Sequence, residues 1–77
     1  MPTMFKVRVN GEKLRQLRTD KFLSRREVAD AAGLHPDHVG RLERGYGGGT
    51  RIENVRKIAQ ALEVDPHELV LEEDDDG

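Results

Sequence analysis

The sequence predicts an all-α fold, a compact five-helix bundle preceded by a short N-terminal strand or arm. Three observations predict it. The chain has 77 residues and no cysteine, so it makes one small domain without disulfides or thiolate metal ligands. Apolar residues recur at helical spacing, and three segments open with polar residues that cap helix N-termini. Agreement between these independent signals favours the same set of helices.

Residues 1–10 are expected to form the arm. Apolar and basic residues alternate there with the period of a strand, and they are Phe5, Lys6, Val7, Arg8 and Val9. A lone strand has no partner inside a helical domain, so it either pairs with its copy in a dimer or lies over the core. The following Asn-Gly is a turn signal, and Asn10 is also a suitable cap for the next helix.

The first predicted helix spans about residues 12–19 and turns Leu14 and Leu17 towards the core. The second begins at Arg25. Residues 24–27 read Ser-Arg-Arg-Glu, the capping-box pattern in which the side chains of the first and last residues bond to each other's backbone N–H groups. The second helix therefore has a well-defined start.

Gly33 ends the second helix, because the chain must turn there with positive φ, which glycine adopts at least cost. Leu34 then fills the corner. Pro36 suits the first position of a third helix, where its missing N–H would be unpaired in any residue. The two helices carry apolar residues at helical spacing, namely Val28, Ala29, Ala32, Val39 and Leu42. This order of features predicts a helix-turn-helix, whose second helix enters a DNA major groove.

A glycine-rich loop at residues 45–49 precedes the fourth helix. Thr50 and Glu53 predict a second capping box for that helix. Its apolar stripe consists of Ile52, Val55, Ile58, Ala59 and Leu62. Residues 65–68, Asp-Pro-His-Glu, repeat the cap signature and predict a short fifth helix that carries Leu69 and Val70.

The net charge of −2 conceals an uneven distribution. Residues 72–76 hold five of the fifteen acidic residues, so residues 1–71 carry thirteen basic against ten acidic side chains, a net charge of +3. We expect residues 11–71 to form the folded domain and residues 72–77 to be a disordered acidic tail. That tail either keeps the protein soluble or competes with nucleic acid for the basic surface.

Several other functions find no support in the sequence. No apolar run approaches the ~20 residues of a membrane span, and the N-terminus lacks the apolar core of a secretory signal. His35 and His38 lie three residues apart, but a stable metal site needs three or four ligands. The loop sequence G-Y-G-G-G-T lacks the G-K-[ST] of a phosphate-binding P-loop. We therefore expect no metal, no cofactor and no enzymatic activity.

Five segments together carry a resemblance to a known family: L-R-Q-L-R at 14–18, L-S-R-R-E-V-A at 23–29, A-G-L at 32–34, V-G-R-L-E-R-G at 39–45 and I-E-N-V-R-K-I-A-Q-A-L-E-V at 52–64. The chain resembles the Cro/C1-type, or XRE, helix-turn-helix domains over about residues 11–70. The resemblance implies a lambda-repressor-like, four- or five-helix DNA-binding domain. It also implies a transcriptional regulator that acts as a homodimer on a two-fold operator.

The third helix, from about Pro36 to Arg44, is expected to read base edges with its outward side chains. That outward set is His35, Pro36, Asp37, His38, Gly40 and Arg41. Arg41 is the best candidate, because a guanidinium pairs bidentately with guanine. Asp37 either accepts from cytosine N4 or interacts with the helix start. Members of the family often carry Gln, Arg, Ser or Thr at the positions of Pro36 and Asp37. Either specificity therefore rests on Arg41, the arm and DNA shape, or strong DNA binding has been lost.

Contacts to backbone phosphates are expected from four side chains, Arg25, Arg44, Tyr46 and Arg51. Lys6 and Arg8 of the arm are weaker candidates. Residues 47–49 either approach a phosphate with their N–H groups or form a simple linker. The resemblance further implies a structural ion pair between Arg18 in the first helix and Glu43 late in the third.

The leading hypothesis is therefore a sequence-specific regulator, a repressor or controller of bacterial or phage origin, cytoplasmic and associated with the nucleoid. Its partners are double-stranded DNA and a second copy of the chain. The alternative is an antitoxin component or another protein-interaction module with a Cro/C1-like fold and weak or no DNA binding. The modest charge of the domain and the absence of a side chain at Gly40 favour that alternative.

Overall fold

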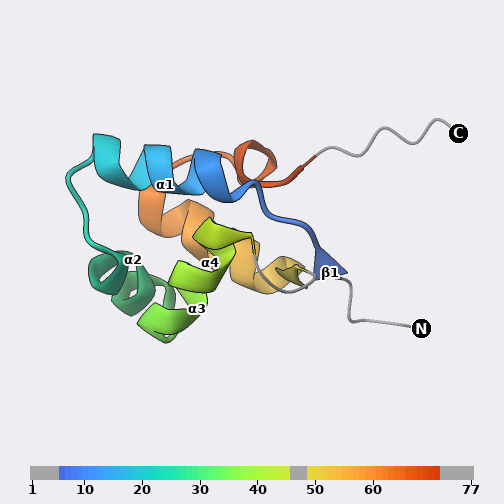
Figure 1. Ribbon diagram of the computed structural model, residues 1–77, viewed down its shortest axis with the longest axis horizontal. Helices are drawn as coiled ribbons and strands as arrows, with labels where there is room; N and C mark the ends of the chain where they lie inside the picture. The colour runs from blue at the N-terminus through green and yellow to red at the C-terminus, as the bar shows by residue number, and fades with distance from the viewer. Residues whose placement is uncertain (1–5, 46–48, 72–77) are drawn as a thin grey trace, which may run out of the picture.

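The computed structural model describes residues 6–45 and 49–71, and these hold four α-helices, a two-stranded ribbon and one 3-10 turn (Figure 1). The helices are α1 (Gly11–Asp20), α2 (Arg25–Ala32), α3 (Pro36–Arg44) and α4 (Ile52–Leu62). The strands are β1 (Lys6–Val7) and β2 (Thr50–Arg51), and the 3-10 turn is η1 (Pro66–Leu69). The mostly helical fold and the helix-turn-helix unit α2–α3 are as the sequence predicts.

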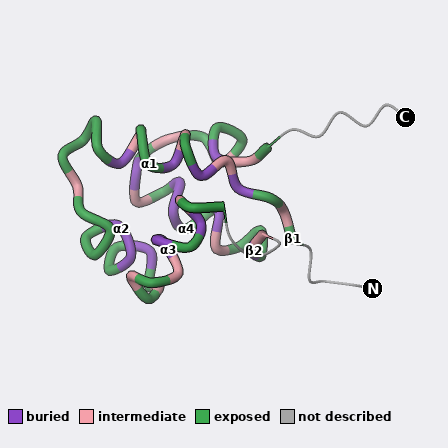
Figure 2. Tube along the Cα trace, in the orientation of Figure 1, coloured by how far each residue is buried: buried purple, intermediate pink, exposed green. Residues whose placement is uncertain are grey.

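All four helices contribute to one core: α4 packs against α2 and η1, and α3 packs against α1 and α2. In Figure 2 the buried stretches of each helix face inward, and the exposed stretches form the outer surface. The buried apolar residues are Val9, Leu14, Val28, Ala29, Ala32, Val39, Leu42, Val55, Ile58, Ala59, Leu62 and Leu69. The apolar stripes of α2, α3 and α4 predict most of this set, because helical spacing places their members on one face.

The predicted N-caps of the first two helices, and the predicted end of α2, are confirmed. Asn10 Oδ1 accepts from the backbone N–H of Lys13 at 3.1 Å, so Asn10 caps α1. Both hydrogen bonds of the α2 capping box are present: the Glu27 N–H donates to Ser24 Oγ at 3.0 Å, and the Ser24 N–H donates to Glu27 Oε1 at 2.8 Å. Gly33 ends α2 with φ of 72°, in the left-handed region that glycine favours.

The expectation of five helices is wrong. The last predicted helix is the single 3-10 turn η1, four residues long. Its cap signature is present, because Asp65 Oδ1 accepts from the His67 N–H at 2.9 Å. The helix does not continue, since Val70 is extended and forms an isolated bridge with Val9. Pairing with the N-terminal segment thus replaces a further helical turn.

The N-terminal strand also departs from expectation, because it has a partner within the chain. β1 pairs antiparallel with β2, with Lys6 opposite Arg51 and Val7 opposite Thr50. Two backbone hydrogen bonds continue the pairing towards the C-terminal side of the domain: the Leu71 N–H donates to the Arg8 carbonyl, and the Asn10 N–H to the Leu69 carbonyl. The strand therefore lies along the core of its own domain.

The predicted capping box of Thr50 and Glu53 does not form. The N-cap of α4 is Arg51, which makes no side-chain capping hydrogen bond. Thr50 is instead a residue of β2, one position too early to cap the helix, and it is buried. Strand pairing thus determines where α4 begins. Phe5, Tyr46, Gly47, Gly48 and the acidic tail lie outside the described residues.

Candidate nucleic-acid interface

The turn between α2 and α3 is fixed by backbone hydrogen bonds and by the first residues of α3. The Leu34 N–H donates to the Ala29 carbonyl at 2.8 Å, which closes the end of α2. His35 is the N-cap of α3, and its Nδ1 accepts from the Asp37 N–H at 3.1 Å. Pro36 takes the first helical position, as predicted. The capping acceptor is therefore His35, and the Asp37 carboxylate is left on the surface.

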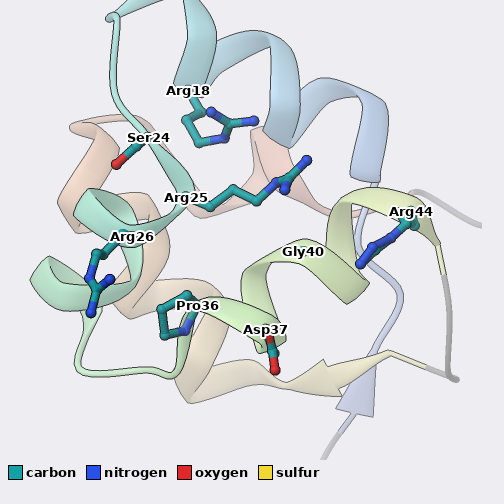
Figure 3. A pocket seen from close by; sticks show the side chains of 8 residues that line it. All are labelled: Arg18, Ser24, Arg25, Arg26, Pro36, Asp37, Gly40 and Arg44. Carbon is teal, nitrogen blue, oxygen red and sulfur yellow. The ribbon is translucent and has the colours of Figure 1, made fainter.

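Three side chains predicted to contact bases lie exposed along α3 and its N-cap. The His35 and Asp37 side chains are 74% and 83% exposed, and Arg41 is also exposed. Asp37 and Arg41 are four residues apart and thus share one face of the helix. The Pro36 ring is half-buried and turns towards α2 (Figure 3).

His38 faces the ribbon rather than the exposed side of α3. Its Nε2 lies 3.1 Å from Thr50 Oγ1, and the same oxygen accepts from Asn54 Nδ2 at 2.9 Å. The network joins α3, β2 and α4 around the buried Thr50 side chain. The sequence alone does not predict this network, because the position of Thr50 depends on the ribbon. The i, i+4 spacing of Thr50 and Asn54 is the signal that was available.

An ion pair joins Arg18 of α1 to Glu43 of α3, the two residues that the resemblance pairs. Arg18 Nε lies 2.6 Å from Glu43 Oε2, and Arg18 Nη2 donates to Glu43 Oε1 at 3.0 Å. Arg18 Nη1 also donates to the Leu23 carbonyl at 2.8 Å. The side chains of Arg18 and Glu43 are only 10% and 3% exposed, so the pair is buried. Hydrogen bonding to Glu43 raises the pKa of Arg18, with burial opposing and the charge of Glu43 adding to the effect.

Arg25, a predicted phosphate contact, also approaches Glu43. Its Nε lies 3.3 Å from Glu43 Oε1, although the Arg25 side chain remains 53% exposed. One buried carboxylate thus faces two guanidinium groups, from α1 and α2. The site around Glu43 therefore carries an excess of positive charge.

A groove of about 460 Å³ opens between the start of α2 and one side of α3. We call it the arginine groove, and it is lined by Arg18, Ser24, Arg25, Arg26, Pro36, Asp37, Gly40 and Arg44. Figure 3 shows Arg25 reaching across it towards α3 and Arg44 directed back along α3 towards Gly40. Among the described residues that line the groove, four are arginines and one, Asp37, is a carboxylate.

Two features of this groove were not predicted. Arg26 lines it beside Arg25, and its position in the first turn of α2 was the available signal. Gly40 is buried, so its expected outward placement is wrong. Of the remaining predicted residues, Arg51 lies exposed on β2, away from the groove, and Tyr46 is outside the described residues.

Within residues 6–45 and 49–71, no three histidine, aspartate or glutamate side chains are placed to hold a metal ion. Over the same described residues, no helix combines the length and the apolar character that crossing a membrane requires.

Comparison with known proteins decides the family. Residues 14–69 match the Helix-turn-helix family, which covers α2, α3 and α4 and most of α1. The chain belongs to the XRE-type helix-turn-helix family. Among characterised proteins, it is 29% identical over 65 residues to the HTH-type transcriptional regulator SinR of Bacillus licheniformis. That match covers 84% of this chain and 59% of the relative, so the chain spans under two thirds of that regulator.

Solved structures of other helix-turn-helix proteins share the fold. The restriction-modification controller protein C.AhdI from Aeromonas hydrophila is 41% identical with a TM-score of 0.72, over 75% of this chain and 86% of that one. The clp gene regulator ClgR from C. glutamicum is 31% identical with a TM-score of 0.67, over 75% and 74%. The biofilm regulator SinR in complex with DNA is 28% identical with a TM-score of 0.70, over 75% and 95%.

Proposed function

We propose that this helix-turn-helix chain is a sequence-specific DNA-binding transcriptional regulator that inserts α3 into the major groove. The observation that carries the proposal is the α2–turn–α3 unit, which presents exposed polar side chains of α3 beside the arginine groove. Two similar proteins, SinR and ClgR, are described as regulators, and a solved SinR structure contains DNA. The phosphate backbone would be met by the groove while α3 reads the base edges.

Arg41 is the residue to which we assign base recognition. It is exposed, and it lies four residues beyond Asp37 on the same face of α3. Unlike the neighbouring arginines, it does not line the arginine groove. An exposed guanidinium of this kind can pair bidentately with guanine O6 and N7. His35 and Asp37 flank it as further polar groups at the start of α3, and Pro36 supplies an apolar contact.

Arg25, Arg26 and Arg44 are assigned to the DNA backbone, because they converge on the arginine groove at the start of α2. Arg51, exposed on β2, is a further phosphate contact on the other side of α3. Each phosphate that these residues neutralise releases counterions from DNA and steepens the salt dependence of binding.

We further propose that the regulator acts as a homodimer. An apolar groove of about 330 Å³ lies at the junction of β1, the start of α4 and η1, and its lining includes Val7, Ile52, Val55 and Val70. Ile52 in the lining is 42% exposed, and Leu71, which follows Val70, is 44% exposed. Two copies related by a two-fold axis would present their α3 helices to half-sites about 34–36 Å apart. Sedimentation velocity of the isolated protein tests this assembly.

The proposed function is tested by DNA binding of an Arg41→Ala variant. The probe is duplex DNA from the region upstream of the chain's own gene, and the measurement is fluorescence anisotropy at several salt concentrations. We expect tight, salt-sensitive binding by the wild type. Loss of one bidentate base contact, worth about 1–3 kcal/mol, should weaken binding by about 5- to 150-fold.

The matched control is Arg15→Ala. Arg15 is exposed on α1 and lies outside the arginine groove, and its replacement changes the net charge by the same amount. Equal losses in the two variants would show that Arg41 acts only through charge. Failure of the wild type to bind below micromolar concentration at low salt, together with co-purification of a protein partner, would instead identify a protein-interaction module.

A further inference from the structure

Gly40 occupies an unusual place for a glycine. It lies in the middle of α3 and has ordinary helical backbone, so no positive φ requires it. Apart from proline, glycine is the least favourable residue in a helix interior. A glycine retained at such a position therefore has a steric reason, either close packing of two backbones or space for something else.

Close packing does not explain Gly40. A Cβ added there would meet only two side chains within 4 Å: Arg44 Nη2 at 3.4 Å and Cζ at 4.0 Å, and Arg25 Cδ at 3.8 Å. No backbone atom of α2 is within that distance. Gly11 gives the contrast, because a Cβ there would overlap the carbonyl oxygens of Leu42 and Glu43. Gly11 is thus a packing glycine, and Gly40 is not.

The space above Gly40 belongs to the arginine groove. Arg25 reaches this point from α2 and Arg44 from one turn further along α3, as Figure 3 shows. A side chain larger than a methyl group at position 40 would project between the Arg25 side chain and the Arg44 guanidinium and fill the floor of the groove. Glycine, buried beneath these two arginine side chains, leaves that floor without a side chain of its own, and the groove of about 460 Å³ has room for a tetrahedral anion.

The charges identify the class of ligand. Four arginines line the groove, and the carboxylates placed near it within residues 6–45 and 49–71 include Asp37 on its lining and Glu43 beside Arg25. Glu43 is already paired with Arg18 and Arg25. Arginine side chains from two helices suit a phosphate, because guanidinium groups donate several hydrogen bonds in one plane to its oxygens.

We propose that Gly40 is a positioning residue that keeps the arginine groove open for one phosphate of the DNA backbone. The proposal rests on the proposed function and adds a specific role to a residue that has no side chain. It also accounts for a helix-weakening residue in the middle of the helix that faces DNA. Filling position 40 should stabilise the free protein and weaken its binding to DNA.

The experiment uses Gly40→Ala and Gly40→Leu, with Ala31→Leu as the matched control. Ala31 is exposed on α2 and does not line the groove, so the control adds a leucine to a helix surface elsewhere. We expect Gly40→Ala to raise the melting temperature by about 4–8 °C, because helix propensity improves and the methyl group fits. Gly40→Leu should lower the affinity for a 20-base-pair duplex by about tenfold or more, the loss of a charge-assisted contact.

Salt dependence and inorganic phosphate provide readouts that a structural role would not change. For Gly40→Leu, the slope of log K against log salt should fall by about 0.9, the value for one phosphate, whereas Ala31→Leu should keep the wild-type slope. Inorganic phosphate should shift the backbone amide resonances of Arg25, Arg26 and Gly40 in the wild type. In Gly40→Leu the shifts at Arg25 and Arg26 should be lost.

The outcomes separate this proposal from the proposed function. If the wild type binds duplex DNA and Gly40→Leu binds it with the same affinity and slope, the role of Gly40 is refuted while the proposed function stands. If the wild type fails to bind duplex DNA but phosphate shifts the groove amides only in the wild type, the groove stands and the proposed function fails. A lower melting temperature for Gly40→Ala would show that Gly40 serves packing.

Discussion

Replacing Glu43 with glutamine tests the buried ion pair that joins α1 to α3. The substitution keeps the shape of the side chain and one acceptor oxygen but removes the charge that faces Arg18. The Glu43 side chain is 3% exposed and that of Arg18 10%, so water cannot compensate. Breaking one side of a buried pair costs about 3–5 kcal/mol. Arg18 keeps its hydrogen bond to the Leu23 carbonyl, and glutamine retains one acceptor oxygen. We therefore expect Glu43→Gln to lower the free energy of unfolding by about 2–3 kcal/mol.

For a domain of this size, that loss corresponds to a fall in melting temperature of about 10–20 °C. Thermal and urea unfolding followed by circular dichroism measures it. The control is Arg25→Gln, because the Arg25 side chain contacts the same carboxylate but is 53% exposed. Removing this exposed contact should lower the free energy of unfolding by less than about 1 kcal/mol. The reasoning is refuted if Glu43→Gln melts no earlier than the wild type or if the two variants lose equal stability.

Three further changes have defined outcomes. Phe22→Gly should raise the melting temperature by several degrees. Phe22 is 93% exposed and has a φ of 57°, a conformation that costs a non-glycine residue about 1 kcal/mol or more. An unchanged melting curve would contradict the assigned strain. Thr50→Val should cost about 1–3 kcal/mol in urea unfolding, because Asn54 loses its buried acceptor. Hydrogen bonds from His67 lower the pKa of Asp65 below its usual 3.8. The ionised carboxylate therefore stabilises the fold above pH 3.8, and this stabilisation is lost as the pH falls through the lowered pKa. Asp65→Asn should therefore unfold with a weaker pH dependence in acid than the wild type.

The α-helical part of the fold could be predicted because its signals are local. The capping box at Ser24 and the left-handed turn at Gly33 each depend on a few neighbouring residues, and both are present as expected. The buried stripe of α4 follows from spacing alone, although Ile52 at its start is 42% exposed. Such features are encoded within about one turn of helix.

The N-terminal strand follows from the alternation in residues 5–9, but its pairing could not be predicted, because β2 has only two residues and carries no periodic signal. Thr50 illustrates the consequence. Its sequence context, three residues before Glu53, indicates a helix cap, but pairing with Val7 makes it part of β2. The same long-range pairing, extended by the bridge from Val9 to Val70, limits the last predicted helix to one 3-10 turn. Contacts between residues more than 40 positions apart thus overrule local preferences.

The candidate site shows the same division. The exposure of Asp37 and Arg41 follows from the apolar spacing of α3, which fixes the opposite face as its surface. The burial of Gly40 and the contact of His38 with Thr50 depend on how α2 and β2 pack beside α3. Helical periodicity predicts which residues share a face of a helix, but it does not predict which neighbouring element covers that face.

An NMR titration of the isotopically labelled protein with duplex DNA tests the central claim most directly. The account predicts that backbone amide resonances shift at the start of α2 and on the exposed side of α3, including Arg25, Asp37 and Arg41, while those on the outer face of α1, such as Arg15, stay in place. Resonances of α2 and α3 that remain unmoved by DNA, or shifts confined to α1, would contradict it.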